Sequence, residues 1–208
     1  MTPEFYVTAF VTLFVVIDPI GTTPIFVALT QGMTAARRRA IAWRACIIGL
    51  LILAAFGLFG EALLGFIGIS MPAFRIAGGL LLFLTALEML FGRRTQRRQS
   101  QAETVEEDPS DDPSVFPLAI PLLAGPGSIT SLILLTDQGG GGWPALGGLF
   151  GVIVVIYAIC LLLFFAAGAI ERGLGETGIL VVTRLLGMLL AALSVQFVLD
   201  GLSNAPLW

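Results

Sequence analysis

The chain has 208 residues, of which 57% are hydrophobic and only 12% are charged, and its formal net charge is −3. A typical soluble domain is about half apolar and about a quarter charged, so this chain carries too little charge to cover a globule. The composition therefore excludes a soluble domain, a secreted disulfide scaffold and a nucleic-acid-binding protein. It indicates an integral membrane protein embedded in a lipid bilayer.

Missing residue types narrow the chemistry further. The chain contains no His, and all 11 basic residues are Arg. His-based metal sites, Ser-His-Asp catalysis, Schiff-base lysines and a lysine-dependent ATP-binding loop are thereby excluded. The two cysteines, Cys46 and Cys160, lie in apolar runs and are predicted to pack inertly. We expect neither an enzyme nor a resident metal or cofactor.

Six apolar runs approach the roughly 20 residues that a helix needs to cross a bilayer. The first begins MTPEF, with an acid and no base, so it is predicted to be a span and not a cleavable signal. The six predicted spans are Phe5–Leu29, Ala45–Ile67, Phe74–Phe91, Phe116–Thr136, Leu146–Ile170 and Arg184–Leu202.

Arginine placement predicts the orientation of these spans. Ten of the 11 arginines fall in the three connections that six spans would put on one face. The positive-inside rule makes that face cytoplasmic, with both termini periplasmic if the membrane is a bacterial inner membrane. These arginines are Arg37, Arg38, Arg39, Arg44, Arg93, Arg94, Arg97, Arg98, Arg172 and Arg184.

The polar stretch 92–115 predicts a solvated cytoplasmic linker between halves 1–91 and 116–208, although a phosphorylated or partner-binding segment is an alternative. The halves share weak features in a common order: Arg75 and Arg184 open the third and sixth spans, and Gly78 and Gly187 follow three residues later. Three spans per half would invert one half relative to the other. We therefore predict an all-α membrane protein of two inverted three-helix repeats.

Proline and glycine interrupt the first and fourth spans, at DPIGTTP (18–24) and AGPGSIT (124–130). Backbone groups freed by such breaks must face protein or a water-filled cavity, and paired breaks point to a binding site at mid-membrane. Thr22 or Thr23, and Ser128, are predicted to cap short helices whose N-termini suit a carboxylate. The predicted substrate-binding residues are Asp18, Pro19, Gly21, Thr22, Thr23, Pro24, Gly125, Pro126, Gly127, Ser128 and Thr130.

Asp18 is the acid predicted to lie deepest, because 13 uncharged residues precede it from Phe5 to Ile17. It would hold a substrate ammonium, a proton or Na⁺, or it would only cap the helix that begins with Pro19. Arg75 and Arg184 would gate the cavity or extend to the lipid headgroups. Gly78 and Gly187 are predicted to be packing residues.

Three runs, FVVIDPIGTTPIFVALT (14–30), FRIAGGLLLFLTALEML (74–90) and PLAIPLLAGPGSIT (117–130), resemble the MarC family of bacterial inner-membrane proteins. The resemblance implies inverted three-helix repeats related to the LysE-type exporters, and in one branch transport of alanine and glycine. The family's first motif usually reads DPxGNxP, so Thr22 replaces the usual Asn. Its second usually reads AGPGA, so Ser128 replaces Ala.

The function expected from these features is secondary transport of a small neutral amino acid, with export as the expected direction and a proton or Na⁺ gradient as the driving force. A passive channel built from the same broken helices is an alternative. A non-transporting membrane protein is a further alternative. An intramembrane aspartyl protease is disfavoured, because it needs two facing acids and only Asp18 is predicted to lie deep. The sequence predicts nothing about the oligomeric state.

Overall fold

The computed structural model describes residues 2–94, 97, 112–140 and 142–205, and within these ranges the secondary structure is helical. Most of the predicted linker, including Arg98, lies outside the described residues. The helices are α1 (Pro3–Ile17), α2 (Pro19–Leu29), α3 (Ala35–Ile67), α4 (Met71–Leu90), η1 (Ser114–Leu123), α6 (Pro126–Gln138), α7 (Trp143–Phe165) and α8 (Ala167–Ser203).

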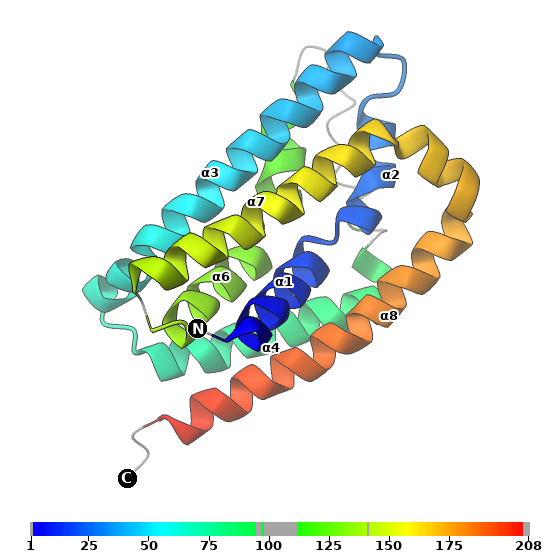
Figure 1. The fold of residues 1–208 in the computed structure, drawn as a ribbon. Helices are drawn as coiled ribbons and strands as arrows, with labels where there is room; N and C mark the ends of the chain where they lie inside the picture. The colour runs from blue at the N-terminus through cyan, green and yellow to red at the C-terminus, as the bar shows by residue number, and fades with distance from the viewer. Residues whose placement is uncertain (1, 95–96, 98–111, 141, 206–208) are drawn as a thin grey trace.

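Five stretches of this part of the chain are long and apolar enough to cross a membrane, and η1 with α6 forms a sixth, bent by 50°. The N- and C-termini lie at the same end of the bundle (Figure 1), as an even number of spans requires. The all-α membrane fold and its two interrupted spans are therefore confirmed. The inverted relation between the halves remains a prediction.

The second span begins earlier than predicted, at Ala35 instead of Ala45. The hydroxyl of Thr34 accepts a hydrogen bond from the backbone N–H of Arg37 and so caps the helix. At 1.5 Å per residue, the 33 residues of α3 extend about 50 Å, well beyond a hydrocarbon core of about 30 Å. The arginines predicted to lie in a loop thus lie on the protruding first turns of α3.

The broken first span forms the centre of the molecule. In the most apolar window of α1 and α2, 67% of the residues are buried, whereas in the four unbroken spans of the described chain the corresponding figure is 28–33%. Leu13 and Ile17 of α1 pack into one hydrophobic cluster with α2, α3 and α7. Val15 and Val16 pack into a second cluster with α4, α6 and α8. The break in this span is therefore surrounded by the other spans.

Helices α4 and α8 pack side by side, and glycines permit their close approach (Figure 1). A Cβ on Gly187 would lie 2.9 Å from the Cβ of Met89, and one on Gly79 would lie 2.8 Å from the carbonyl oxygen of Ser194. Gly78 faces the methyl group of Thr130 in α6. Gly78 and Gly187 thus lie where neighbouring helices approach closely.

Candidate functional site

The first interruption is a single residue, Asp18, whose backbone is left-handed at φ 56° and ψ 63°. Its carboxylate accepts a hydrogen bond from the backbone N–H of Gly21 at 3.1 Å, so Asp18 is the N-cap of α2 and Pro19 is its first residue. The prediction that Thr22 or Thr23 caps this helix is wrong, since both lie within it. The structure thus confirms Asp18 as a cap before a first-turn proline, and its role toward a substrate or coupling ion stays a prediction.

The polar groups around this break are hydrogen-bonded to its own backbone. The hydroxyls of Thr22 and Thr23 donate to the carbonyl oxygens of Asp18 and Pro19, each at 2.8 Å. A Cβ on Gly21 would overlap the Asp18 carboxylate, so only glycine lets that carboxylate fold over the helix end. Asp18, Thr22 and Thr23 are all at most 1% exposed. These residues fix the geometry of the break.

The second interruption separates η1 from α6. The backbone of η1 is non-helical at Phe116 and Ile120, and the bonds before Pro117 and Pro121 are cis. Gly125 is the N-cap of α6, and its missing Cβ would clash with the carbonyl oxygen of Pro121. This close approach bends the span at Gly125.

Ser128 was predicted to cap α6, and this prediction is wrong. Pro126 already occupies the first helical position, so the cap falls on Gly125. The Ser128 hydroxyl donates to the carbonyl oxygen of Gly125 at 2.9 Å and lies within the first turn. The backbone N–H groups of Gly127 and Ser128 belong to that turn, where a helix leaves its amides without partners in the helix.

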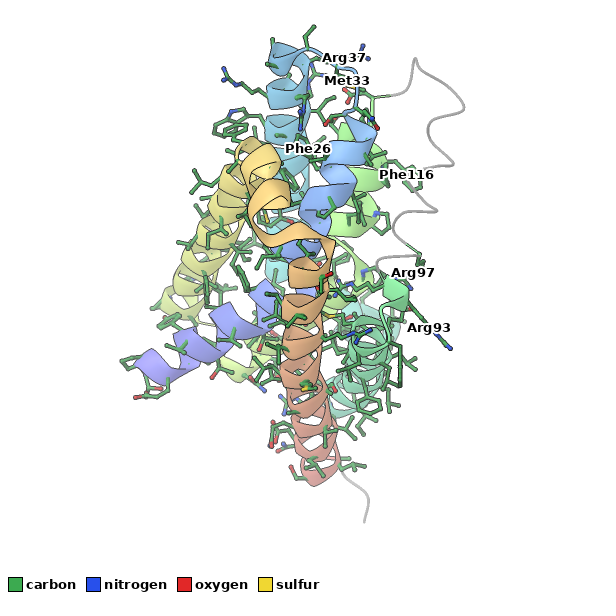
Figure 2. All side chains as sticks on the ribbon, turned by 90° about the vertical axis from the view of Figure 1, so that its right-hand side faces the viewer. Phe26, Met33, Arg37, Arg93, Arg97 and Phe116 are labelled. Atoms are coloured by element: carbon green, nitrogen blue, oxygen red, sulfur yellow. The ribbon has the colours of Figure 1, made fainter. Side chains whose placement is uncertain are left out.

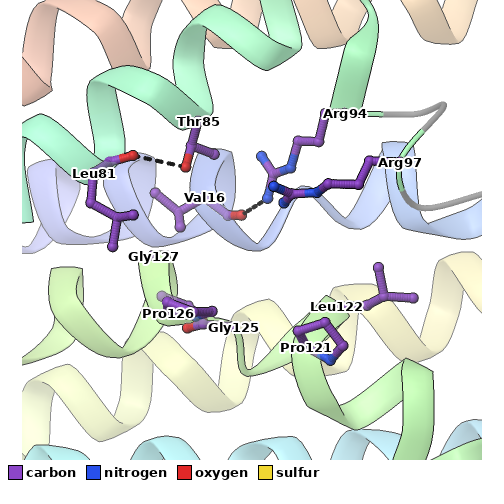
Figure 3. A pocket seen from close by; sticks show the side chains of 11 residues that line it. Val16, Leu81, Thr85, Arg94, Arg97, Pro121, Leu122, Gly125, Pro126 and Gly127 are labelled. Atoms are coloured by element: carbon purple, nitrogen blue, oxygen red, sulfur yellow. Dashed lines mark hydrogen bonds between the residues drawn. The ribbon is translucent and has the colours of Figure 1, made fainter. Parts of the chain in front are cut away.

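The two interruptions meet inside the bundle. A Cβ on Gly127 would lie 3.1 Å from Cγ1 of Val16, which is two residues before Asp18. Beside this contact lies a cavity of about 140 Å³ (Figure 3). It is lined by Val16, Leu81, Thr85, Arg94, Arg97, Pro121, Leu122, Gly125, Pro126, Gly127 and Ser128.

Arg94 is the cavity residue that sequence reasoning did not single out. It follows α4 in the predicted connection, but the structure buries its side chain, which is only 6% exposed. Its guanidinium donates to the carbonyl oxygen of Val16 at 2.6 Å (Figure 3). It also contacts the sulfur of Met89 at 3.0 Å. Arg94 follows the third span within one turn, yet no local pattern distinguishes it from its exposed neighbour Arg93.

Among the residues that the structure describes, the cavity lining carries positive charge. It combines the guanidinium groups of Arg94 and Arg97 with the first turn of α6, the positive end of a helix dipole. None of the described residues that line it is acidic, and Glu88, outside the lining, pairs with Arg97 at 2.8 Å. Arg97 and Arg93 lie at the end of α4, on the side that carries Phe116 (Figure 2). The arrangement suits an anionic group.

The predicted site residues divide between the cavity and its supports. Four of them line it: Gly125, Pro126, Gly127 and Ser128. The other seven do not, and they are Asp18, Pro19, Gly21, Thr22, Thr23, Pro24 and Thr130. Among the residues that the structure describes, no three of His, Cys, Asp and Glu lie close enough to hold a metal ion.

An ion pair joins the two halves at the other end of the bundle. Arg75, in the first turns of α4, is hydrogen-bonded to the carboxylate of Asp137 near the end of α6. The two side chains are only 13% and 24% exposed. Arg184, the other arginine predicted to gate or extend to headgroups, is exposed on α8. Asp137 was not singled out because it lies just beyond the predicted fourth span.

Comparison with known proteins matches this architecture to one family. The sequence pattern of the MarC family of integral membrane proteins matches residues 3–205. The chain belongs to the MarC family. Among MarC relatives, the UPF0056 membrane protein MJ1677 of Methanocaldococcus jannaschii is 36% identical over the whole of both chains.

Two further relatives are bacterial. The UPF0056 membrane protein YvbG of Bacillus subtilis is 38% identical over 97% of this chain and 95% of its own. YhcE of Escherichia coli, also named a UPF0056 membrane protein, is 36% identical over 96% of this chain and 92% of its own. No solved structure matches. This MarC protein is thus an integral, multi-pass membrane protein.

Proposed function

We propose that this MarC protein is a secondary transporter of a small solute that carries a carboxylate, with neutral amino acids such as alanine or glycine as the first candidates. The observation that carries the proposal is the Arg94 guanidinium beside the first turn of α6, in a cavity where two broken spans meet. A carboxylate bound there would accept charge-assisted hydrogen bonds from Arg94 and from the first-turn amides of α6.

The size of the cavity supports a small solute. Its volume of about 140 Å³ is close to that of an engineered cavity of about 150 Å³ that binds benzene. Alanine has the same number of non-hydrogen atoms as benzene. Longer side chains would meet Leu81 and Leu122, which line the cavity.

Two features at opposite ends of the bundle support alternating access. Arg97 lines the cavity and its side chain is 57% exposed, so the cavity reaches the arginine-rich surface. Toward the other end, the Arg75–Asp137 pair joins α4 to α6. We infer a state open to the cytoplasm, which loads solute for export from the bacterial inner membrane, with both termini outside.

Asp18 is assigned to coupling in this proposal. Its carboxylate is buried against Gly21 at the break and does not line the cavity. Binding of a proton or Na⁺ to this carboxylate would alter the cap of α2 and so link the ion gradient to movement of the break. The substrate's ammonium group would then lie toward carbonyl oxygens of the η1 kink, such as that of Pro121, and not toward Asp18.

The binding test uses alanine and two simpler analogues on detergent-purified protein: propionate, which lacks the ammonium, and ethylamine, which lacks the carboxylate. We expect alanine and propionate to raise the melting temperature and ethylamine to leave it unchanged. Stabilisation by ethylamine alone, or by none of the three, would contradict the proposal. Saturable counterflow in proteoliposomes supports a carrier, whereas flux that rises linearly with solute concentration indicates a channel.

A further inference from the structure

A second hollow, of about 670 Å³, lies where the end of α2, the start of α3, the end of α7 and the start of α8 come together. It shares no lining residue with the central cavity. Two arginines and four aromatic rings line it: Arg38, Arg39, Phe26, Trp43, Phe164 and Phe165. Phe26 lies below Arg37 at this end of the molecule (Figure 2).

The charged side chains that line this hollow are positive, and Arg38 is held against an aromatic ring. The rings of Phe26 and Phe164 stack with centroids 4.5 Å apart, and the guanidinium carbon of Arg38 lies 5.7 Å from the Phe26 centroid. Ala35, the first residue of α3, also lines the hollow and adds the positive end of a long helix. None of its described lining residues is acidic, so an anion is favoured.

The hollow also adjoins exposed apolar surfaces of α3 and α7. Ile47 and Leu51 are 48% and 62% exposed and form a lipid-facing stripe on α3. Trp43 precedes Ile47 by one turn on that face and is itself 52% exposed. On α7, the exposed side chain of Leu162 lies one turn before that of Phe165, which is also exposed and lines the hollow. Tryptophan at the end of an apolar stripe is typical of the headgroup region.

We propose that this hollow binds the headgroup of an anionic phospholipid from the leaflet on the arginine-rich side. Its phosphate lies between Arg38 and Arg39, and its acyl chains run along α3 and α7 past Trp43 and Phe165. Basic pockets between membrane helices recognise such headgroups, and each arginine near the surface contributes about 1 kcal/mol to the attraction. This site is independent of the proposed transport function.

The first experiment is native mass spectrometry of the detergent-purified protein with phosphatidylglycerol or phosphatidylcholine of identical acyl chains. We expect tighter binding of phosphatidylglycerol, and a loss of about 25-fold in the Arg38→Gln, Arg39→Gln double variant, at about five-fold per arginine. Arg37→Gln is the matched control, since Arg37 is exposed on the same turn but does not line the hollow. Equal binding of the two lipids, or an equal per-residue loss in Arg37→Gln, would overturn the proposal.

A second measurement uses the native arginines and therefore stands even if the double variant fails to fold. In a chain whose other tryptophans, Trp143 and Trp208, are replaced by Phe, brominated phosphatidylglycerol quenches Trp43 more strongly than brominated phosphatidylcholine. Glycerol 3-phosphate and inorganic phosphate, added at the concentration of the lipid, leave that quenching unchanged. Full reversal by either one would mean a site for free phosphate and would overturn a lipid site.

Discussion

Arg94 donates a hydrogen bond at 2.6 Å to the carbonyl oxygen of Val16, which precedes it by 78 residues. Val16 lies at the C-terminal end of α1, where a helix leaves its last carbonyl groups without partners in the helix. The guanidinium thus gives the carbonyl oxygen of Val16, at the break in the first span, a hydrogen-bond partner. It also lines the cavity. A movement of α4 relative to α1 would change both the break and the cavity together.

Replacing Arg94 with Gln should weaken carboxylate binding strongly. The variant loses the charge that faces the cavity and leaves the carbonyl of Val16 with a weaker donor. A hydrogen bond to a charged group contributes about 1.5–3 kcal/mol, so we expect binding of alanine to weaken by about 10- to 100-fold. Isothermal titration or the ligand-induced shift in melting temperature would measure this change.

Two further variants separate binding from folding at this position. Arg93→Gln removes a neighbouring arginine that is exposed, and it should bind alanine as the parent chain does. Arg94→Lys keeps the charge without the planar fork of donors, so it should retain part of the affinity. Unchanged affinity in Arg94→Gln would place the carboxylate elsewhere.

Asp18 offers a test of coupling apart from folding. Asn is a good N-cap and tolerates the left-handed backbone of residue 18, so Asp18→Asn should keep the melting temperature within a few degrees. Asp18→Ala loses the cap and should destabilise the fold by about 1–2 kcal/mol. We expect counterflow to persist in Asp18→Asn while accumulation driven by a proton or Na⁺ gradient is lost. Gradient-driven accumulation at the rate of the parent chain would remove Asp18 from coupling.

The six spans and both interruptions could be predicted because they depend on local properties. Apolar length defines a span, and the prolines and glycines of 18–24 and 124–130 disrupt a helix wherever it packs. The choice of cap was harder, since Asp18-Pro19 and Thr23-Pro24 are both a capping residue followed by proline. The structure selects the first because Gly21 leaves room for the Asp18 carboxylate.

The polar partners of the site could not be predicted, because each depends on contacts between distant segments. Arg94 and Arg93 are alike in sequence, yet only Arg94 turns inward to Val16. Arg75 and Asp137 are separated by 62 residues and face each other only after α4 packs against α6. No periodicity in one sequence encodes such pairs.

Gly125 should tolerate no side chain. A Cβ there would clash with the backbone carbonyl of Pro121, which cannot rotate away as a side chain would. Gly125→Ala should therefore destabilise the protein by about 1–3 kcal/mol and alter the cavity. Thermal unfolding in detergent measures this effect. Gly151→Ala in α7 is the matched control, since a Cβ there meets nothing within 4 Å, and an equal loss in both variants would contradict the role of the Pro121 contact.

The Arg75–Asp137 pair should couple the two halves more strongly than an exposed pair does. Its side chains are 13% and 24% exposed, whereas those of Arg44 and Asp112 are 63% and 42% exposed. Exposed pairs contribute about 0.2–1 kcal/mol, and breaking a buried pair costs about 3–5 kcal/mol. A double-mutant cycle of Arg75→Gln and Asp137→Asn should therefore give a coupling energy between these ranges. A value no larger than that from the matching Arg44→Gln, Asp112→Asn cycle would assign the pair no special role.

The Arg44–Asp112 pair should make the junction of α3 with η1 sensitive to acid. Burial raises the pKa of Asp112, but the backbone N–H of Ser114 at 3.0 Å and Arg44 at 2.6 Å together lower it below its ordinary value of 3.8. A carboxylate whose pKa is lowered by folding stabilises the fold fully above that ordinary value, and the contribution is lost as the pH falls through the folded pKa.

Both side chains of this pair are well exposed, so solvent screening keeps the effect below about 1 kcal/mol. Melting temperatures of the parent chain and of Asp112→Asn, measured from pH 6 to pH 2.5, should differ slightly at pH 6 and converge below pH 3.8. Arg44→Gln should show a smaller loss on acidification than the parent chain, because its Asp112 pKa lies closer to the ordinary value. A stability difference that widens as the pH falls would mean that folding raises this pKa, which would contradict the hydrogen bonds at Asp112.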